Sequence, residues 1–185
     1  MRGKKYNSGM TAEQRLLKHF LAAIAYRTQK ALRGAPESFA EFCAGCNART
    51  PHELVWHMTG VLGYARTYFR GGVWQPDKLA TFAAEMERFH QVLEGLGAVL
   101  EEPPVRSLAM EQLLQGPLAD VMTHAGQLAL LRRLAGSPVP PENFIRAAID
   151  ARNLGANQPA PAAPDPGWSP DLPPQAPGKN IPEGW

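Results

Sequence analysis

Cysteine is scarce in this chain of 185 residues, which contains only Cys43 and Cys46. Small secreted proteins that depend on disulfide bonds need several pairs, so this class is excluded. A thioredoxin-like Cys-x-x-Cys motif needs a strand-to-helix context, and a structural zinc site needs a second cysteine pair. The sequence indicates neither, and we interpret the two cysteines as an incidental pair in a loop.

Long apolar runs and an excess of one charge are also lacking. The formal net charge is only +2, and the one basic cluster is the short segment 2–5. These properties argue against nucleic acid and against an anionic membrane as partners. The most apolar early stretch, residues 16–25, is interrupted by Lys18 and His19, which makes it too polar for a signal peptide and too short to span a bilayer. We therefore expect a soluble, cytoplasmic protein.

Helical periodicity dominates the first 135 residues, and no segment shows convincing strand alternation. The pattern predicts helices over residues 11–33, 51–70, within 77–100, and 117–135, with a short helical piece at 107–115. The second helix has the clearest start, because Thr50 and Glu53 form a capping box around Pro51 at the first helical position. Four helices of this length joined by short loops predict an all-α protein with the architecture of a four-helix bundle.

Proline is concentrated in the last quarter of the chain, where 12 of the 18 prolines fall between Pro138 and Pro182. We expect one short helix within residues 142–153 and no regular structure from residue 155 onward. The composition permits a flexible tail or an extended arm laid over the bundle or a partner subunit. Two tryptophans favour the arm, and its apolar anchors would be Leu154, Trp168, Leu172, Ile181 and Trp185. The expected organisation is an N-terminal tail (1–10), a bundle (11–154) and a Pro-rich C-terminal extension (155–185).

Asp120 and His124 are the most informative residues of the last predicted helix. Four residues separate them, so both project from one helical face, which also carries Leu128. That face is expected to be buried, and a buried carboxylate is costly without a partner. A metal ion is one such partner, with His57 of the second helix as third ligand; the competing interpretation is a core histidine hydrogen-bonded to Asp120. Histidine and carboxylate ligands suit Zn, Ni, Fe, Mn or Co, which the sequence does not distinguish.

Two segments resemble motifs of the DinB/YfiT-like superfamily of damage-inducible metalloproteins. Residues 50–58 (TPHELVWHM) are similar to its second-helix motif, and residues 120–128 (DVMTHAGQL) followed by 131–136 (LRRLAG) are similar to its last-helix motif. The resemblance covers residues 11–161 and implies an up-down-down-up four-helix bundle that forms a homodimer. This order requires a crossover between the second and third helices, which fits best if the third helix begins near Thr81.

The same resemblance implies a metal held by three residues, usually one histidine of the second helix and an H-x-x-x-H pair of the last. His57 and His124 match two of these positions. Asp120 stands in place of the remaining histidine, which adds a negative charge and leaves open whether the site is intact. Tyr64 and Gln127 are further candidates for the surrounding pocket.

The activity implied by the resemblance is S-transfer, in which a metal-bound low-molecular-weight thiol attacks an electrophile. Metal-dependent hydrolysis is the alternative reaction, and a non-enzymatic, dimeric, stress-associated binding protein is the alternative class. The partners would be a small-molecule thiol or electrophile. The sequence does not identify a general base or the substrate.

The remaining polar candidates are interpreted more simply. His90 borders the inward face of the third helix as a partly exposed residue, and it is the best replacement ligand if Asp120 fails. His52 is expected to be solvated in the first turn of its helix. Arg132 and Arg133 are expected to lie on a salt-bridged surface near the C-terminus of the last helix, where cations are favoured.

Overall fold

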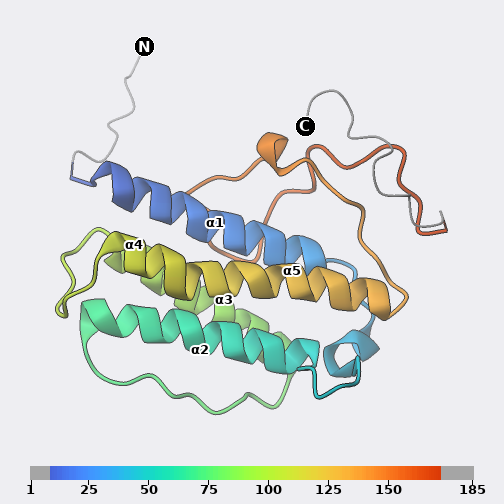
Figure 1. Ribbon diagram of the computed structural model, residues 1–185, viewed down its shortest axis with the longest axis horizontal. Helices are drawn as coiled ribbons and strands as arrows, with labels where there is room; N and C mark the ends of the chain where they lie inside the picture. Colours follow the sequence, from blue (N-terminus) through green and yellow to red (C-terminus); the bar gives the residue numbers. More distant parts are fainter. Residues whose placement is uncertain (1–8, 172–185) are drawn as a thin grey trace.

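Four long helices pack side by side in the part of the chain described by the structure, a computed structural model that covers residues 9–171 (Figure 1). They are α1 (Ala12–Leu32), α2 (Pro51–Arg70), α3 (Phe82–Val99) and α5 (Ala119–Leu134). Within residues 9–171 there is no β-strand, only an isolated bridge between Glu142 and Pro164. The predicted all-α four-helix bundle is therefore confirmed.

The order of the helices is up-down-down-up. In Figure 1, α1 and α5 run in one direction and α2 and α3 in the other, and residues 71–81 return along the outside of the bundle to the start of α3. Thr81 caps α3, its hydroxyl accepting from the backbone N–H of Ala84 at 3.2 Å. The expectation that this helix begins near Thr81 is thus confirmed, and residues 71–81 are the crossover.

The predicted capping box of α2 is present. Thr50 Oγ1 accepts from the Glu53 backbone N–H at 3.3 Å, and Glu53 Oε2 accepts from the Thr50 N–H at 2.9 Å. Pro51 occupies the first turn, and Gly71 ends the helix with a φ of 72°, a conformation that favours glycine. These signals fix the first and last residues of α2, the helix that carries His57.

The start of the last helix differs from the prediction. Pro117 does not begin a helix; it lies within a π-helical turn, Leu114–Leu118, that joins α4 (Met110–Leu113) to α5. Proline lacks an N–H and its ring collides with the preceding turn of a regular α-helix. The wider π turn relieves this conflict and lets the chain continue as a helix.

Arg132 also differs from the prediction, because its side chain is buried rather than on a salt-bridged surface. Its guanidinium donates to the carbonyl oxygens of Ala31 and Arg33 at 3.0 and 3.2 Å, and to that of Ser137 at 2.8 Å. Carbonyl groups at the end of a helix have no partner within the helix. Arg132 therefore satisfies the C-terminal end of α1 and joins it to α5.

The chain beyond α5 lies along α1, as Figure 1 shows. Arg33 of α1 donates to the carbonyl oxygens of Gln158 and Pro159 at 2.7 and 3.0 Å. Glu142, which is buried, accepts from Tyr26 Oη at 2.7 Å and from the Ala162 N–H at 3.0 Å. As far as residue 171, the extended-arm interpretation is therefore correct, whereas Leu172, Ile181 and Trp185 lie outside the described residues.

The short helix expected within residues 142–153 does not form; the segment contains only a 3₁₀ turn, Phe144–Arg146. The Asn143 N–H donates to Ala163 O, and the Asp165 N–H donates to Pro141 O. Pairing with the returning chain thus replaces the local hydrogen bonds that a helix would need.

His90 is buried beneath this arm instead of being partly exposed. Its Nδ1 lies 3.0 Å from the carbonyl oxygen of Leu154, to which it donates, and Leu154 packs over Gly97. Burial lowers the pKa of His90, which keeps the ring neutral. His90 therefore has a structural role and is no replacement ligand for Asp120.

None of the helices within residues 9–171 combines the length and the apolar character needed to cross a bilayer.

Candidate metal centre

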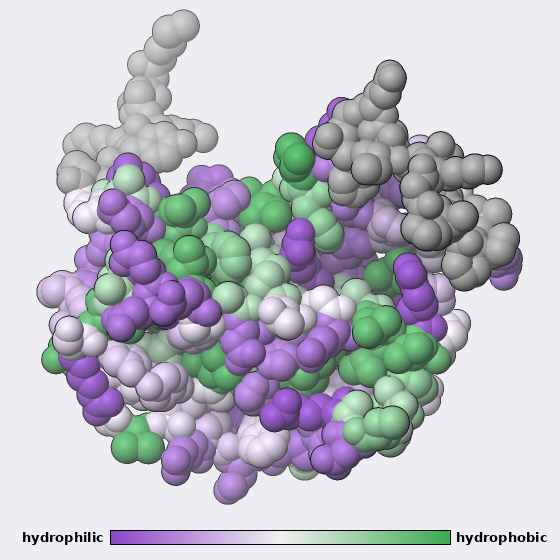
Figure 2. Space-filling view, in the orientation of Figure 1, coloured by the Kyte–Doolittle hydropathy of each residue, from purple (hydrophilic) through white to green (hydrophobic). Residues whose placement is uncertain are grey.

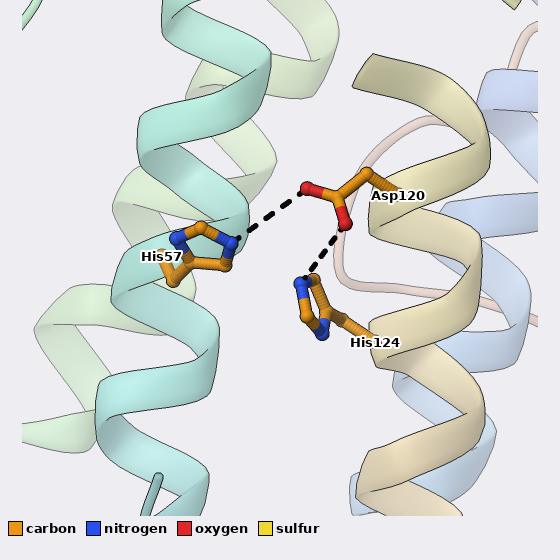
Figure 3. A group of neighbouring side chains, drawn as sticks. All are labelled: His57, Asp120 and His124. Atoms are coloured by element: carbon orange, nitrogen blue, oxygen red, sulfur yellow. Dashed lines mark ion pairs between the residues drawn. The ribbon is translucent and has the colours of Figure 1, made fainter. Parts of the chain in front are cut away.

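Three side chains from two helices converge on one point (Figure 3). His57 projects from α2, and Asp120 and His124 project from α5. His57 Nε2 lies 3.6 Å from Asp120 Oδ2, and His124 Nε2 lies 3.2 Å from Asp120 Oδ1. The three ligand atoms lie within 4.8 Å of one another. The sequence placed these residues together correctly.

The spacing of the donor atoms suits a transition-metal ion. Donors that surround a tetrahedral ion at ~2.1 Å are about 3.4 Å apart. Both distances to the Asp120 carboxylate are close to this value, so a slight rotation of the side chains would bring the group to coordination distance. In addition, Nε2 of His124 is buried and has no hydrogen-bond partner among the described residues. A metal ion bound between the three side chains would provide a partner for this Nε2 lone pair.

The burial of the triad corrects one step of the sequence argument. Asp120 was expected to be buried, yet 46% of its side chain is exposed, compared with 32% for His57 and 9% for His124. The three predicted residues do lie together, but Asp120 is not the buried carboxylate from which the prediction started. The site is an open one, with His124 at its base and Asp120 at the rim, and a small molecule can reach it from solvent.

His57 is electrostatically prepared to act as a ligand. Partial burial, followed by the nearby Arg49 and His124, lowers the pKa of His57, and the opposing effect of Asp120 is smaller. The ring is therefore neutral at neutral pH, with a lone pair available for a metal. Because the His57 ring is neutral, its contact with Asp120 is not an ion pair and stabilises the pair only weakly.

Gln127 orients His124. Its Oε1 lies 2.7 Å from His124 Nδ1, and because an amide oxygen only accepts, the proton of the ring is on Nδ1. The Nε2 lone pair then points toward Asp120 and His57. The predicted association of Gln127 with the site thus takes the form of a contact behind the ligand, the arrangement that commonly fixes metal-binding histidines.

Replacing Gln127 with leucine should weaken metal binding by roughly 10- to 100-fold, the usual effect of losing a partner behind a histidine ligand. Leucine keeps the size of the side chain and removes the acceptor. Gln127→Glu retains an acceptor and should bind metal at least as well as the original protein. The dissociation constants for Co²⁺ provide the measurement, and equal affinity in the leucine variant would show that Gln127 does not orient the ring.

A large hollow of about 1140 Å³ opens beside the triad, and His57 and Asp120 form part of its wall. Its other walls come from the α2 surface, the crossover and the π turn, where Gly116 and Pro117 line it. Tyr64, a predicted pocket residue, lines it as well. A site with room for a substrate next to its ligands differs from a closed structural metal site.

The crossover is held firmly as a wall of this hollow. The Trp56 indole N–H donates to Pro76 O at 2.9 Å, and Arg88 donates to Asp77 O at 2.9 Å. Trp74 lies directly on Gly63, where a Cβ atom would meet the indole at 2.1 Å. Sequence reasoning missed this wall, because only the fold brings the crossover back over α2; the glycine at position 63 was the one available signal.

A second hollow, of about 690 Å³, lies between α2, α5 and the loop before α2. Leu130 and Leu134, which are 55% and 56% exposed, line it. Figure 2 shows an apolar area at the right-hand end of the bundle, on a face where polar and apolar areas alternate. Arg49 and Trp56 line both hollows.

The other candidate residues lie apart from the triad, which is the one metal-ligating group of this kind within residues 9–171. His19 is exposed on α1, and Cys43 and Cys46 are exposed with free thiols. His52 is buried rather than solvated, with Nδ1 3.1 Å from Glu41 Oε1. Glu41 belongs to the 3₁₀ turn Glu37–Glu41, and the Phe82 ring at the start of α3 lies 5.9 Å from the His52 ring on centroids.

Comparison of the chain with models of known protein families, with curated proteins and with solved structures gave no match. The functional interpretation therefore depends on the site itself and on the sequence motifs that form it.

Proposed function

We propose that this chain is a metal-dependent enzyme in which His57, Asp120 and His124 bind one divalent ion. The observation that carries the proposal is their convergence from two helices at the edge of a hollow large enough for a small molecule. Three protein ligands leave coordination positions open, which is typical of catalytic sites. Two neutral imidazoles and one carboxylate also leave a positive charge on a divalent ion.

The reaction that we propose is S-transfer from a low-molecular-weight thiol to an electrophile. When bound, a divalent ion supplies Lewis acidity and lowers the pKa of a thiol or water that it coordinates. His57 and His124 contribute neutral donors, and Gln127 holds the second ring in place. The resemblance of residues 50–58 and 120–128 to the DinB/YfiT-like motifs supports this reaction, and the up-down-down-up bundle with its His-Asp-His group is consistent with that superfamily.

The hydroxyl groups near the site are engaged in hydrogen bonds, which supports a thiol substrate rather than a side chain as the nucleophile. Thr123 lines the hollow, but its hydroxyl donates to the carbonyl oxygen of Ala119 at 2.9 Å. Tyr64 shares a 2.6 Å hydrogen bond with Tyr68, in which either hydroxyl can be the donor, so the Tyr64 hydroxyl is already engaged. A thiol substrate needs no nucleophilic side chain.

The proposal is tested with the untagged protein, loaded with Zn²⁺, Ni²⁺, Fe²⁺, Mn²⁺ or Co²⁺, and a panel of thiols with 1-chloro-2,4-dinitrobenzene. In this reaction the thiol sulfur bonds to the ring carbon, chloride leaves with the bonding electron pair, and the thiol proton passes to the buffer. We expect turnover that a chelator abolishes and that added metal restores. Metal-dependent ester cleavage without thiol would show hydrolysis instead, and stoichiometric metal without either reaction would favour the binding protein.

A further inference from the structure

Arg49 is a cation without a partner at the mouth of the candidate metal centre. It directly precedes the N-cap of α2, is exposed, and lines both the hollow beside the triad and the second hollow. Within residues 9–171, no ion pair or hydrogen bond engages its side chain. Arg49 lines the same hollow as His57 and Asp120, which places its charge near the triad. A free guanidinium this close to the site is available for a ligand.

The other charged groups of the large hollow do not cancel this cation once an ion is bound. Asp120 and Asp77 line the same hollow, and Glu53 lies close enough for Arg49 to contribute to lowering its pKa. Glu53 is already engaged, because its carboxylate accepts from the Thr50 N–H. With a divalent ion bound, the ion contributes two positive charges and Asp120 one negative charge. Arg49 and Asp77 carry opposite single charges, so the hollow has a net positive charge.

Aromatic side chains form much of the remaining wall. Trp56, Tyr64 and Trp74 line the hollow, and the hydrogen bond from Trp56 to Pro76 fixes the first indole. Trp74 is held against Gly63 on one side, and the Arg66 guanidinium lies 5.0 Å from its ring. Rigid indoles offer a large apolar contact area at little cost in conformational entropy. These walls suit a flat apolar body.

We propose that the hollow beside the triad binds a small organic anion with a flat aromatic body, whose anionic group pairs with the Arg49 guanidinium while the body lies against Trp56 and Trp74. This rests on the proposed function and narrows its electrophilic substrate to aromatic acids. Guanidinium groups form two parallel hydrogen bonds with carboxylates, which makes Arg49 the residue that selects for charge.

The test uses the full chain loaded with Co²⁺ and two probes of the same shape, 2-naphthoate and its neutral amide, 2-naphthamide. Isothermal titration calorimetry should show that naphthoate binds about tenfold more tightly, the difference expected for one charge-assisted contact. Arg49→Gln should abolish this preference, with the affinity for naphthamide unchanged. Arg133→Gln, an exposed arginine of α5 outside both hollows, should retain it.

The outcomes separate this inference from the proposed function. Cobalt content, measured in every sample, reports whether the triad binds an ion, so a protein without cobalt would contradict the proposed function. If cobalt is present, equal affinity for the two probes, no binding of naphthoate, or a preference that survives in Arg49→Gln would each overturn the role of Arg49. The last result would mean that the carboxylate binds the ion directly.

Discussion

Replacing His57 with alanine is expected to lower the affinity for a divalent ion by more than 100-fold. Loss of a partner behind a ligand costs roughly 10- to 100-fold, and loss of a ligand itself should cost more. His57 is the only member of the triad on α2, so its removal leaves Asp120 and His124 on α5 as an incomplete site. Dissociation constants for Co²⁺ and Zn²⁺ from competition with a chromophoric chelator measure the effect.

The matched control is His19→Ala, which removes an exposed histidine of α1 far from the triad in sequence and should bind metal like the original protein. Thermal unfolding of metal-free samples shows whether the fold is intact. Because His57 is only partly buried, its loss should change that transition little. Unchanged metal affinity in the folded His57→Ala variant would refute the assignment of this ligand.

Replacing Arg132 with methionine is expected to reduce the free energy of unfolding by about 3 kcal/mol, since buried acceptors that lose a charged donor are costly. The guanidinium serves the carbonyl oxygens of Ala31, Arg33 and Ser137, and only 3% of the residue is exposed. Methionine retains the apolar volume of the side chain, so the loss reports on the hydrogen bonds. Urea unfolding of the metal-free protein provides the free energies.

The neighbouring Arg133 provides the control for this second prediction. It lies on the same helix and is exposed, so Arg133→Met should change the free energy of unfolding by no more than ~0.5 kcal/mol. Equal effects of the two substitutions would contradict the role assigned to Arg132, because a general contribution of positive charge would then explain both.

The sequence predicted the helices and the triad because both depend on local signals. Helical periodicity predicted the four long segments, and the capping box at Thr50 predicted the start of α2. The position of His57, three residues after the buried Leu54, placed it on the inward face of that helix. The i, i+4 spacing placed Asp120 beside His124. Facing helices in a bundle then brought the two parts of the site together.

The errors came from contacts between segments distant in the sequence. Arg132 and His90 are buried because the end of α1 and the arm after α5 cover them, and neither contact leaves a periodic signal. Pairing of the Asn143 N–H with Ala163 prevents the expected helix. The binding wall formed by the crossover was missed for the same reason, since only the fold places Trp74 on Gly63.

The central claim is that side chains of α2 and α5 share one metal ion, and anomalous diffraction from crystals of the Zn²⁺-loaded protein tests it most directly. Data collected on both sides of the zinc absorption edge locate the ion independently of the protein atoms. We expect one strong peak at about 2.0–2.2 Å from Nε2 of His57, a carboxylate oxygen of Asp120 and Nε2 of His124. A peak at other residues, or a fully loaded protein with no peak between these three side chains, would contradict the account.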